Sequence, residues 1–423
     1  MFDWANSAYA LVITAAIFPA YFNGVTNTYD DAGELISKNV EFLGFTLKNS
    51  TLFSYSVSFG YLVIAAALPL LTGIADYAGR KMYFMKRFTY MGAIACIALY
   101  FFTGTPTLFI GVLGFVIALV GFAGGQVFYN SYLPLIATEE KLDSVSAKGF
   151  SMGYIGSVLL LATNLAVILN EEALGFSPGF GSQLAFVSVG LWWMGFAQIP
   201  FNRLPKDTPR PVTQGVMKKG YQEIQKVWRE LQHLPNTKRF LTSYFFYISG
   251  VMTVMMLATI FAEDELKMDT GKLIATVLII QLVGIVGAYF FAKLSDWMGN
   301  RFSLLVMLFI WIGICLAAYY VTITKEETHF FILAGVVGLV MGGIQSLSRS
   351  TYSKLIPENT TDTASFFSFF DVLEKTGIVI GTFLFGYVGE KYGMDNSVLA
   401  LIPFFVVGIG VLLTVKIQRR ETS

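Results

Sequence analysis

Four ionisable residues lie inside long apolar stretches, where a charge is costly unless it is paired or hydrated. Asp371, Glu374 and Lys375 share one such stretch, and Arg349 lies in the stretch before it. Residues three or four positions apart occupy one face of a helix, so Asp371 faces the same side as Glu374 and Lys375. We interpret Lys375 and Arg349 as countercharges for the two carboxylates. The pattern predicts either a carboxylate that binds and releases a proton or a permanent structural ion pair.

Amide and aromatic side chains recur in other apolar stretches, where they could hold a small solute through a few polar contacts. The candidates for binding the solute are Asn6, Tyr9, Gln126, Tyr129, Asn130, Gln281 and Gln345. Asp3 is a further candidate for coupling or ion pairing, and it could equally anchor the first apolar stretch where that stretch meets water. Hydrogen bonding between helices is the alternative role for each amide.

A short motif occurs twice, 220 positions apart. Aspartate at a helix end, glycine for close approach and basic residues after it suit a charged latch between helices, closed in one state and open in another. A plain turn would explain the basic residues but not the aspartate and glycines. The latch residues are Gly73, Asp76, Gly79, Arg80 and Lys81 in the first copy, and Asp296 and Arg301 in the second.

Long apolar runs must position these residues. The chain of 423 residues is 55% hydrophobic and 13% charged, well below the charged fraction of about 25% in soluble proteins. A bilayer core needs about 20 apolar residues per helix, and about twelve runs meet that length. They lie near 4–23, 51–75, 84–104, 107–137, 147–170, 182–202, 239–262, 271–292, 302–324, 329–355, 363–388 and 396–416.

The repeated motif and the span count predict two similar six-helix halves. We expect an N-terminal bundle over 1–202, a linker with an amphipathic helix over 203–238, and a C-terminal bundle over 239–423. Matching residues at the ends of spans 4 and 10 and at the starts of spans 5 and 11 support this duplication. Such halves can rock and expose one polar interior to either side in turn.

Lys and Arg concentrate in the linker and in the loops on its side of the predicted bundle. Because short cytoplasmic loops keep positive charge during insertion, we expect both termini in the cytoplasm. Glycines at small-residue spacing, such as Gly377 and Gly381, predict close helix packing. Short loops favour a bacterial inner membrane.

The segment 73–81 resembles the motif that the major facilitator superfamily carries after its second span, with a degenerate copy after the eighth. Segments 3–9, 128–134 and 345–350 are similar to the vacuole-effluxer family, typified by a fungal autophagy-related amino-acid exporter. The resemblance runs essentially end to end. It implies the facilitator fold and amino-acid efflux. One departure is Ser249-Gly250, where the family usually has Asp-Gly, so any cation or proton role of that aspartate is absent here.

The sequence therefore predicts an all-α membrane protein of the major facilitator fold that moves a small solute. An enzyme is disfavoured, because no nucleophile with a paired base, metal-ligand cluster or phosphate loop appears. No cofactor is expected, and a net charge of +1 does not point to nucleic acid. We expect a monomer whose partners are the solute, the lipid bilayer and, for a coupled mechanism, protons. Two alternatives stay open, a lipid or cell-wall-fragment flippase and a non-transporting membrane receptor.

Overall fold

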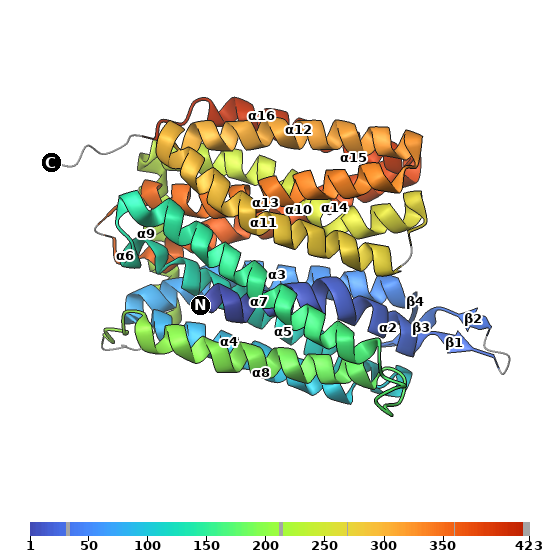
Figure 1. Ribbon diagram of the computed structural model, residues 1–423. Helices are drawn as coiled ribbons and strands as arrows, with labels where there is room; N and C mark the ends of the chain where they lie inside the picture. The colour runs from blue at the N-terminus through green and yellow to red at the C-terminus, as the bar shows by residue number, and fades with distance from the viewer. Residues whose placement is uncertain (31–33, 211–214, 269, 359, 418–423) are drawn as a thin grey trace. The chain divides into compact units, whose positions relative to one another are not determined.

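The computed structural model describes residues 1–30, 34–210, 215–268, 270–358 and 360–417, and most of them are helical (Figure 1). Among these residues, 11 helices are long and apolar enough to cross a bilayer. The expected third span, near 84–104, is also helical. Its helix contains three charged residues, Lys81, Lys86 and Arg87, and is therefore too polar to count among the 11 candidate spans. The prediction of an all-α membrane fold is confirmed.

The first half of the sequence begins with a continuous helical span and contains two small hairpins before its second span. The helices are α1 (Phe2–Ala8), α2 (Phe18–Thr26), α3 (Asn49–Ala78), α4 (Lys81–Ala98), α5 (Leu108–Asn130), α6 (Leu133–Ile136), α7 (Leu142–Ile168) and α8 (Phe180–Arg203), with 3-10 turns at Leu99–Phe101, Thr105–Thr107 and Glu139–Lys141. The hairpins pair β1 (Thr28–Tyr29) with β2 (Leu35–Ser37) and β3 (Asn39–Phe42) with β4 (Phe45–Lys48). The hairpins are an addition to the expected architecture.

The second half follows a linker whose described start, residues 204–210, is not helical. Its helices are α9 (Val216–His233), α10 (Pro235–Leu266), α11 (Thr270–Met298), α12 (Asn300–Thr324), α13 (Glu327–Leu355), α14 (Thr363–Tyr392), α15 (Met394–Leu399) and α16 (Ile402–Leu412). The linker helix α9 lies where the amphipathic helix was expected. The last expected span, near 396–416, is broken between α15 and α16, just before Pro403, because proline has no backbone N–H to continue a helix.

The first span departs from a regular α-helix between α1 and α2. Residues Tyr9–Ile17 form a π-helix, in which each backbone N–H bonds five residues back. This winding turns the side chains that follow it relative to a plain α-helix, so the apolar pattern alone could not place them. Such segments occur often at functional sites.

Contacts divide the chain into two compact units that do not follow the expected halves. Unit 1 comprises residues 1–67, 81–129 and 155–207. Unit 2 comprises residues 68–80, 130–154 and 208–423. The last turns of α3 and the first turns of α7 therefore belong with the second half of the sequence.

Unit 1 has an aromatic core around Phe18. Its ring stacks on Phe115 at 4.9 Å between centroids and lies edge-on to Phe186 at 5.7 Å. Trp193 on α8 is fully buried and lies 5.7 Å from the ring of Tyr9. These rings join the first span to α5 and α8 over most of its length.

Unit 2 relies on glycines for close helix packing. In Figure 1, α11, α12 and α13 run side by side. A Cβ added at Gly342 would lie 2.1 Å from the backbone oxygen of Gly284, so α11 and α13 meet through their backbones. Gly381 lies equally close to Thr253, which confirms the expected packing role of the α14 glycines.

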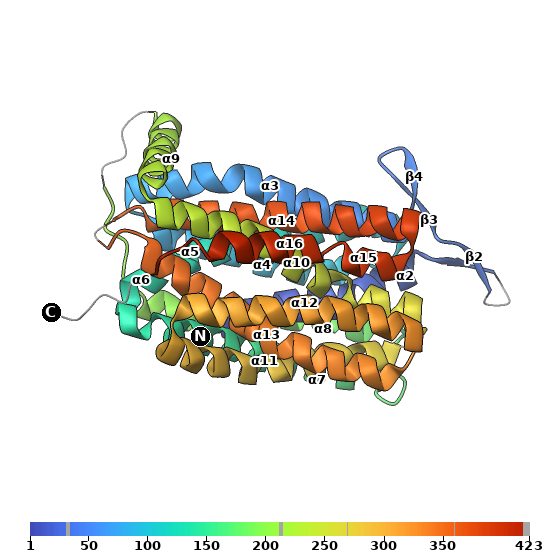
Figure 2. The same cartoon turned by 90° about the horizontal axis from the view of Figure 1, so that it is seen from above.

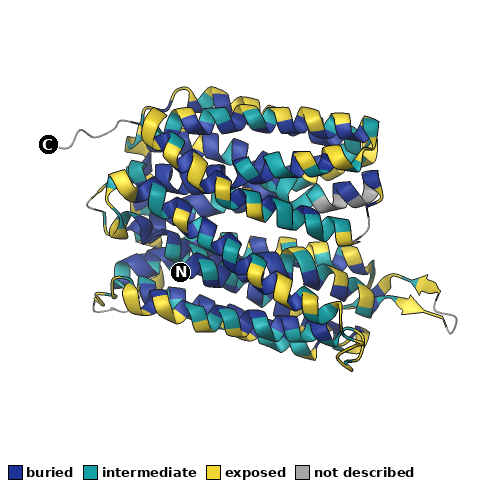
Figure 3. Cartoon of the chain, in the orientation of Figure 1, coloured by how far each residue is buried: buried dark blue, intermediate teal, exposed yellow. Residues whose placement is uncertain are grey.

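Buried and exposed residues alternate along most helices (Figure 3). The exposed positions include large apolar side chains such as Leu62, Ile332 and Phe383, which are exposed by 65%, 63% and 73%. Apolar side chains exposed in such numbers indicate contact with lipid. The chain is a multi-pass membrane protein.

Candidate functional site

A buried cluster of charges lies on α14. The ammonium of Lys375 is 2.5 Å from Glu374 Oε1 and 3.4 Å from Asp371 Oδ1. The hydroxyl of Tyr244, on α10, donates to Glu374 Oε2 at 2.8 Å. Asp371 and Lys375 are each only 4% exposed, and Asp371 Oδ2 has no hydrogen-bond partner among the described residues. The structure thus brings together three of the four charges singled out in the sequence, two carboxylates and one ammonium.

Arg349 lies at a different polar site, against the first turns of α7 and the last residue of α5. Its guanidinium donates from Nε to Ser146 Oγ at 2.9 Å, and from Nη1 to Asn130 Oδ1 at 3.1 Å. The ring of Phe150 lies 4.4 Å from the guanidinium carbon. Among the described residues, Lys375 is therefore the countercharge of Asp371 and Glu374. Arg349 instead joins α13 to residues of the first half of the sequence.

Three solute-binding candidates and Asp3 cluster in unit 1 around the start of the first span. The hydroxyl of Tyr129 donates to Asp3 Oδ2 at 2.6 Å. Asn6 is buried, and its Oδ1 has no hydrogen-bond partner among the described residues. Tyr9 is buried in the π-helix, and its hydroxyl lies 3.4 Å from the Phe115 carbonyl oxygen.

The glutamine candidates are half-buried. Gln126 lies on α5 of unit 1. Gln345 accepts from the Tyr154 hydroxyl at 3.0 Å. Gln281 Oε1, on α11, is buried with no partner in the part of the chain that the structure describes. An unpaired buried acceptor costs free energy, so Asn6 and Gln281 are the amides best placed to gain a partner when a solute binds.

The first motif copy joins the end of α3 to the start of α14. The carboxylate of Asp76 is buried, and its Oδ2 accepts from Ser365 N at 2.7 Å and from Ser365 Oγ at 2.6 Å. A carboxylate at the first turn of a helix also gains from the helix dipole. Gly79 needs a left-handed φ of +62°, and a Cβ there would meet the Thr208 carbonyl.

The other residues of this copy lie around that contact. Gly73 packs against α9, since an added Cβ would lie 2.3 Å from the Gly220 carbonyl oxygen. Arg80 is exposed, and Lys81 is half-buried at the start of α4.

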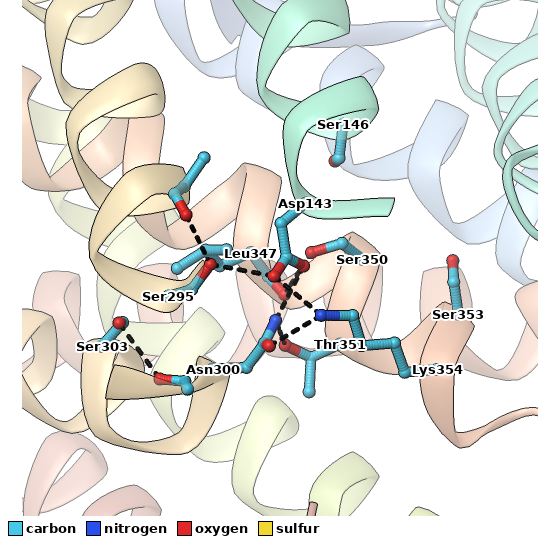
Figure 4. Close-up of polar contacts among 12 residues, drawn as sticks. Asp143, Ser146, Ser295, Asn300, Ser303, Leu347, Ser350, Thr351, Ser353 and Lys354 are labelled. Carbon is cyan, nitrogen blue, oxygen red and sulfur yellow. Dashed lines mark hydrogen bonds and ion pairs between the residues drawn. The ribbon is translucent and has the colours of Figure 1, made fainter. Parts of the chain in front are cut away.

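The second copy, at the end of α11, is not equivalent to the first. Figure 4 shows the contacts of Ser295 and Asn300 with Asp143. Asp296 is exposed, and the preceding residue, Ser295, is the buried one. Ser295 Oγ donates to Asp143 Oδ2 at 2.8 Å, and Asn300 Nδ2 donates to Asp143 Oδ1 at 2.8 Å. Asp143 lies in the first turn of α7. The carboxylate is here supplied by the helix start and the donors by the motif, the reverse of the first copy.

A lysine completes this second contact. Lys354, near the end of α13, pairs with Asp143 Oδ2 at 2.7 Å, and both side chains are largely buried. Arg301 does not enter it, because its guanidinium donates to the Leu413 carbonyl beyond α16. We call the Asp76–Ser365 contact the first latch, and the Asp143–Ser295–Asn300–Lys354 contact the second latch.

The sequence reasoning missed the partners in both latches. Ser365, Asp143 and Lys354 lie at the predicted ends of spans, where polar residues are ordinary. A search for charges near the span ends that the motif should meet would have drawn attention to Asp143 and Lys354. Among the described residues, no group of three or more His, Cys, Asp or Glu side chains could hold a metal ion.

Comparison with known proteins identifies the chain. Residues 1–423 match the family model described as vacuole effluxer Atg22 like. The chain is 30% identical to the MFS-type transporter YxiO of Bacillus subtilis, over 100% of this chain and 94% of that protein. It is 27% identical to autophagy-related protein 22 of Kluyveromyces lactis, over 87% and 79% of the two chains.

Solved structures show the same fold at low identity. The transporter FucP in its outward conformation aligns with a TM-score of 0.68 and 13% identity, covering 98% of this chain and 97% of that one. The proton:xylose symporter XylE aligns with a TM-score of 0.68 and 10% identity, covering 97% and 93%. These likenesses show the major facilitator fold, and the relatives are transporters rather than enzymes. The chain belongs to the vacuole effluxer Atg22-like family of major facilitator transporters.

Proposed function

We propose that this transporter moves a small amino acid, or a similar zwitterionic or amphipathic metabolite, by alternating access coupled to protons. The observation that supports the coupling is the α14 cluster. There, the carboxylates of Asp371 and Glu374 both pair with the ammonium of Lys375, away from solvent. Removing a charge from water is costly, so a proton that neutralises the second carboxylate is favoured there. Binding or release of that proton would alter the pairing of Lys375.

The two latches support alternating access. Each latch ties a segment from the first half of the sequence to helices of the second half, through a buried carboxylate. Both contacts lie at helix ends, so they can break without unwinding a span. We propose that they close one end of the transporter and open when the other end closes.

The solute would contact the amide and aromatic candidates. Asn6 and Gln281 support this role, because each has a buried oxygen without a described partner. A zwitterion presents an ammonium group that could donate to such oxygens. The family model is described as a vacuole effluxer, which supports the movement of a small solute across the membrane.

The membrane orientation is also a proposal. The linker and α9 carry many basic residues, which supports a cytoplasmic position for this end and for both termini. We further propose a bacterial inner membrane and a monomeric transporter.

Flux into proteoliposomes tests the proposed function. A panel of labelled amino acids should include one that is taken up, and uptake should respond to a proton gradient. Asp371→Asn or Glu374→Gln should remove the response to pH while the protein still folds. The matched control is Glu390→Gln, an exposed carboxylate on the same helix, which should leave the response intact.

Other outcomes separate the alternatives. Unchanged pH dependence in both cluster variants would reject proton coupling by this cluster. Solute binding without flux would indicate a receptor. Movement of labelled lipid, with no amino-acid uptake, would indicate a flippase.

A further inference from the structure

The linker helix α9 has three distinct faces. Gly220, Val227 and Leu231 are buried. A second face carries Met217, Tyr221 and Trp228, which are exposed by 63%, 58% and 55%. These three positions fall within about 40° of one another on a helix of 3.6 residues per turn. The exposed apolar stripe therefore lies next to the buried face but is not covered by it.

The third face is basic. Lys218, Lys219 and Arg229 are exposed, and Lys218 and Arg229 lie farther around the helix, away from the buried face, with Gln225 and Gln232 between them and the apolar stripe. Two half-buried glutamates, Glu223 and Glu230, accompany the four basic residues of α9, and Glu223 is within 3.4 Å of Lys226, so a net positive charge remains on the helix. An apolar stripe flanked by exposed lysine and arginine suits the boundary between acyl chains and anionic headgroups.

The orientation of α9 suits a position at the boundary between acyl chains and headgroups. Figure 2 shows α9 running across α14 at one end of it, rather than along it. Because α14 is long and apolar enough to span the bilayer, a helix that crosses its end lies in the plane of the membrane surface. At this position the stripe would face lipid, which a soluble partner would have to displace to reach it.

Three contacts attach α9 to the first latch. Lys226 Nζ is 2.5 Å from Asp362, the residue before α14. The hydrogen bond to that carboxylate raises the pKa of Lys226, so the ammonium stays charged. The ring of Trp228 lies 5.8 Å from that of Phe369, and Gly220 meets Gly73 on α3. Thus α9 touches both helices that Asp76 and Ser365 join.

We propose that α9 binds anionic phospholipid headgroups through Lys218, Lys219 and Arg229, and that this binding steadies the first turn of α14 through Lys226 and Asp362. The occupant of the exposed stripe is the bilayer itself. Its lipid composition would then set how readily the first latch opens. This last effect on transport rests on the proposed function, whereas lipid binding by α9 does not.

Amide hydrogen exchange in nanodiscs tests the proposal without any transport assay. The full chain is compared in phosphatidylcholine discs with and without phosphatidylglycerol. A basic residue near an anionic surface contributes about a fivefold preference for it. We therefore expect amides of residues 216–233 to exchange severalfold more slowly in the anionic discs. The variant K218Q/K219Q/R229Q should lose that slowing.

A matched control removes the same charge elsewhere. Lys141, Lys148 and Lys293 are exposed on other elements, and K141Q/K148Q/K293Q should keep the response of α9 to phosphatidylglycerol. Equal exchange of α9 in the two kinds of disc would overturn the proposal, and so would an equal loss of the response in both triple variants. Protection that appears only when a cell extract is added would indicate a protein partner instead.

Coupling between α9 and the first latch is measured by hydrogen exchange in a second segment, at the start of α14. In the native chain, phosphatidylglycerol should also slow exchange across residues 363–369. Lys226→Gln should abolish this effect on α14 while leaving the protection of α9 in place. Persistence of the α14 effect in that variant would show that Lys226 does not transmit it. Because neither readout uses solute, a failed flux assay and a failed lipid response remain distinguishable.

Discussion

Asp76 and Asp296 hold equivalent places in the repeated motif but have different surroundings. Asp76 is 2% exposed and accepts two hydrogen bonds from Ser365, whereas Asp296 lies on the exposed side of its helix end. Burial strengthens a charged hydrogen bond and also makes an unpaired partner costly. At the residue scale, we therefore expect Asp76 to contribute more than Asp296 to the free energy of unfolding, although both hold the same motif position.

This difference gives a direct prediction. Asp76→Ala should lower the free energy of unfolding by about 1–3 kcal/mol, because the start of α14 loses the acceptor for its backbone and hydroxyl donors. Asp296→Ala should change it by less than about 0.5 kcal/mol, as surface substitutions usually do. Thermal unfolding of both variants in the same detergent measures the contrast. Equal losses would mean that burial does not separate the two copies.

At the scale of elements, α10 and α14 are held together by small residues. A Cβ at Gly381 would lie 2.0 Å from Thr253 Oγ1 and 2.7 Å from the Ser249 carbonyl oxygen. A Cβ at Gly377 would likewise lie 2.6 Å from Ser249 Oγ. Ser249, where the family resemblance led us to expect an aspartate, therefore lies at this close helix contact, and its hydroxyl donates to the Phe245 carbonyl oxygen. The close approach also places Tyr244 beside Glu374.

Gly381→Ala tests this packing. The added methyl group meets backbone, so we expect a loss of about 1–3 kcal/mol in stability, typical of overpacking. Gly386 lies on the same helix with nothing within 4 Å of an added Cβ, and Gly386→Ala serves as the control. It should be neutral or stabilise by up to about 1 kcal/mol through helix propensity. Similar melting temperatures for the two variants would contradict the close-contact interpretation.

At the scale of the whole molecule, charge placement predicts which ends of the helices share a compartment. The β1–β2 hairpin and the linker helix α9 are separated in sequence by five expected spans after the first. With both termini on the linker side, the hairpin must face the opposite compartment. The family assignment is consistent with a multi-pass protein, but the orientation is a separate prediction.

Cysteine labelling in intact cells measures that orientation. Cys96 and Cys315 are buried, so they should not react with an impermeant maleimide. Asp30→Cys should react from outside the cell, and Lys218→Cys should react only after permeabilisation. Reaction of both positions from the same side would refute the two-sided arrangement and with it the proposed alternating access.

The sequence alone determined that the chain lies in a lipid bilayer, and it determined the class of fold and the family. Bilayer thickness sets a minimum length for each apolar run, so span number and approximate bounds follow from local composition. It also singled out Asp371, Glu374 and Lys375, because a charge in an apolar run is conspicuous wherever the helix packs.

Only the tertiary structure decided which polar groups meet. The partners Asp76 and Ser365, Asp143 and Lys354, and Glu374 and Tyr244 are each separated by more than a hundred residues. In a membrane helix, the core-facing and lipid-facing sides are both apolar, so periodicity does not reveal which side a residue faces. The π-helix at Tyr9–Ile17 turned the first span in a way that no local pattern marked. Burial of Asp76 and exposure of Asp296 followed from the helices packed around them, which is information that a motif does not contain.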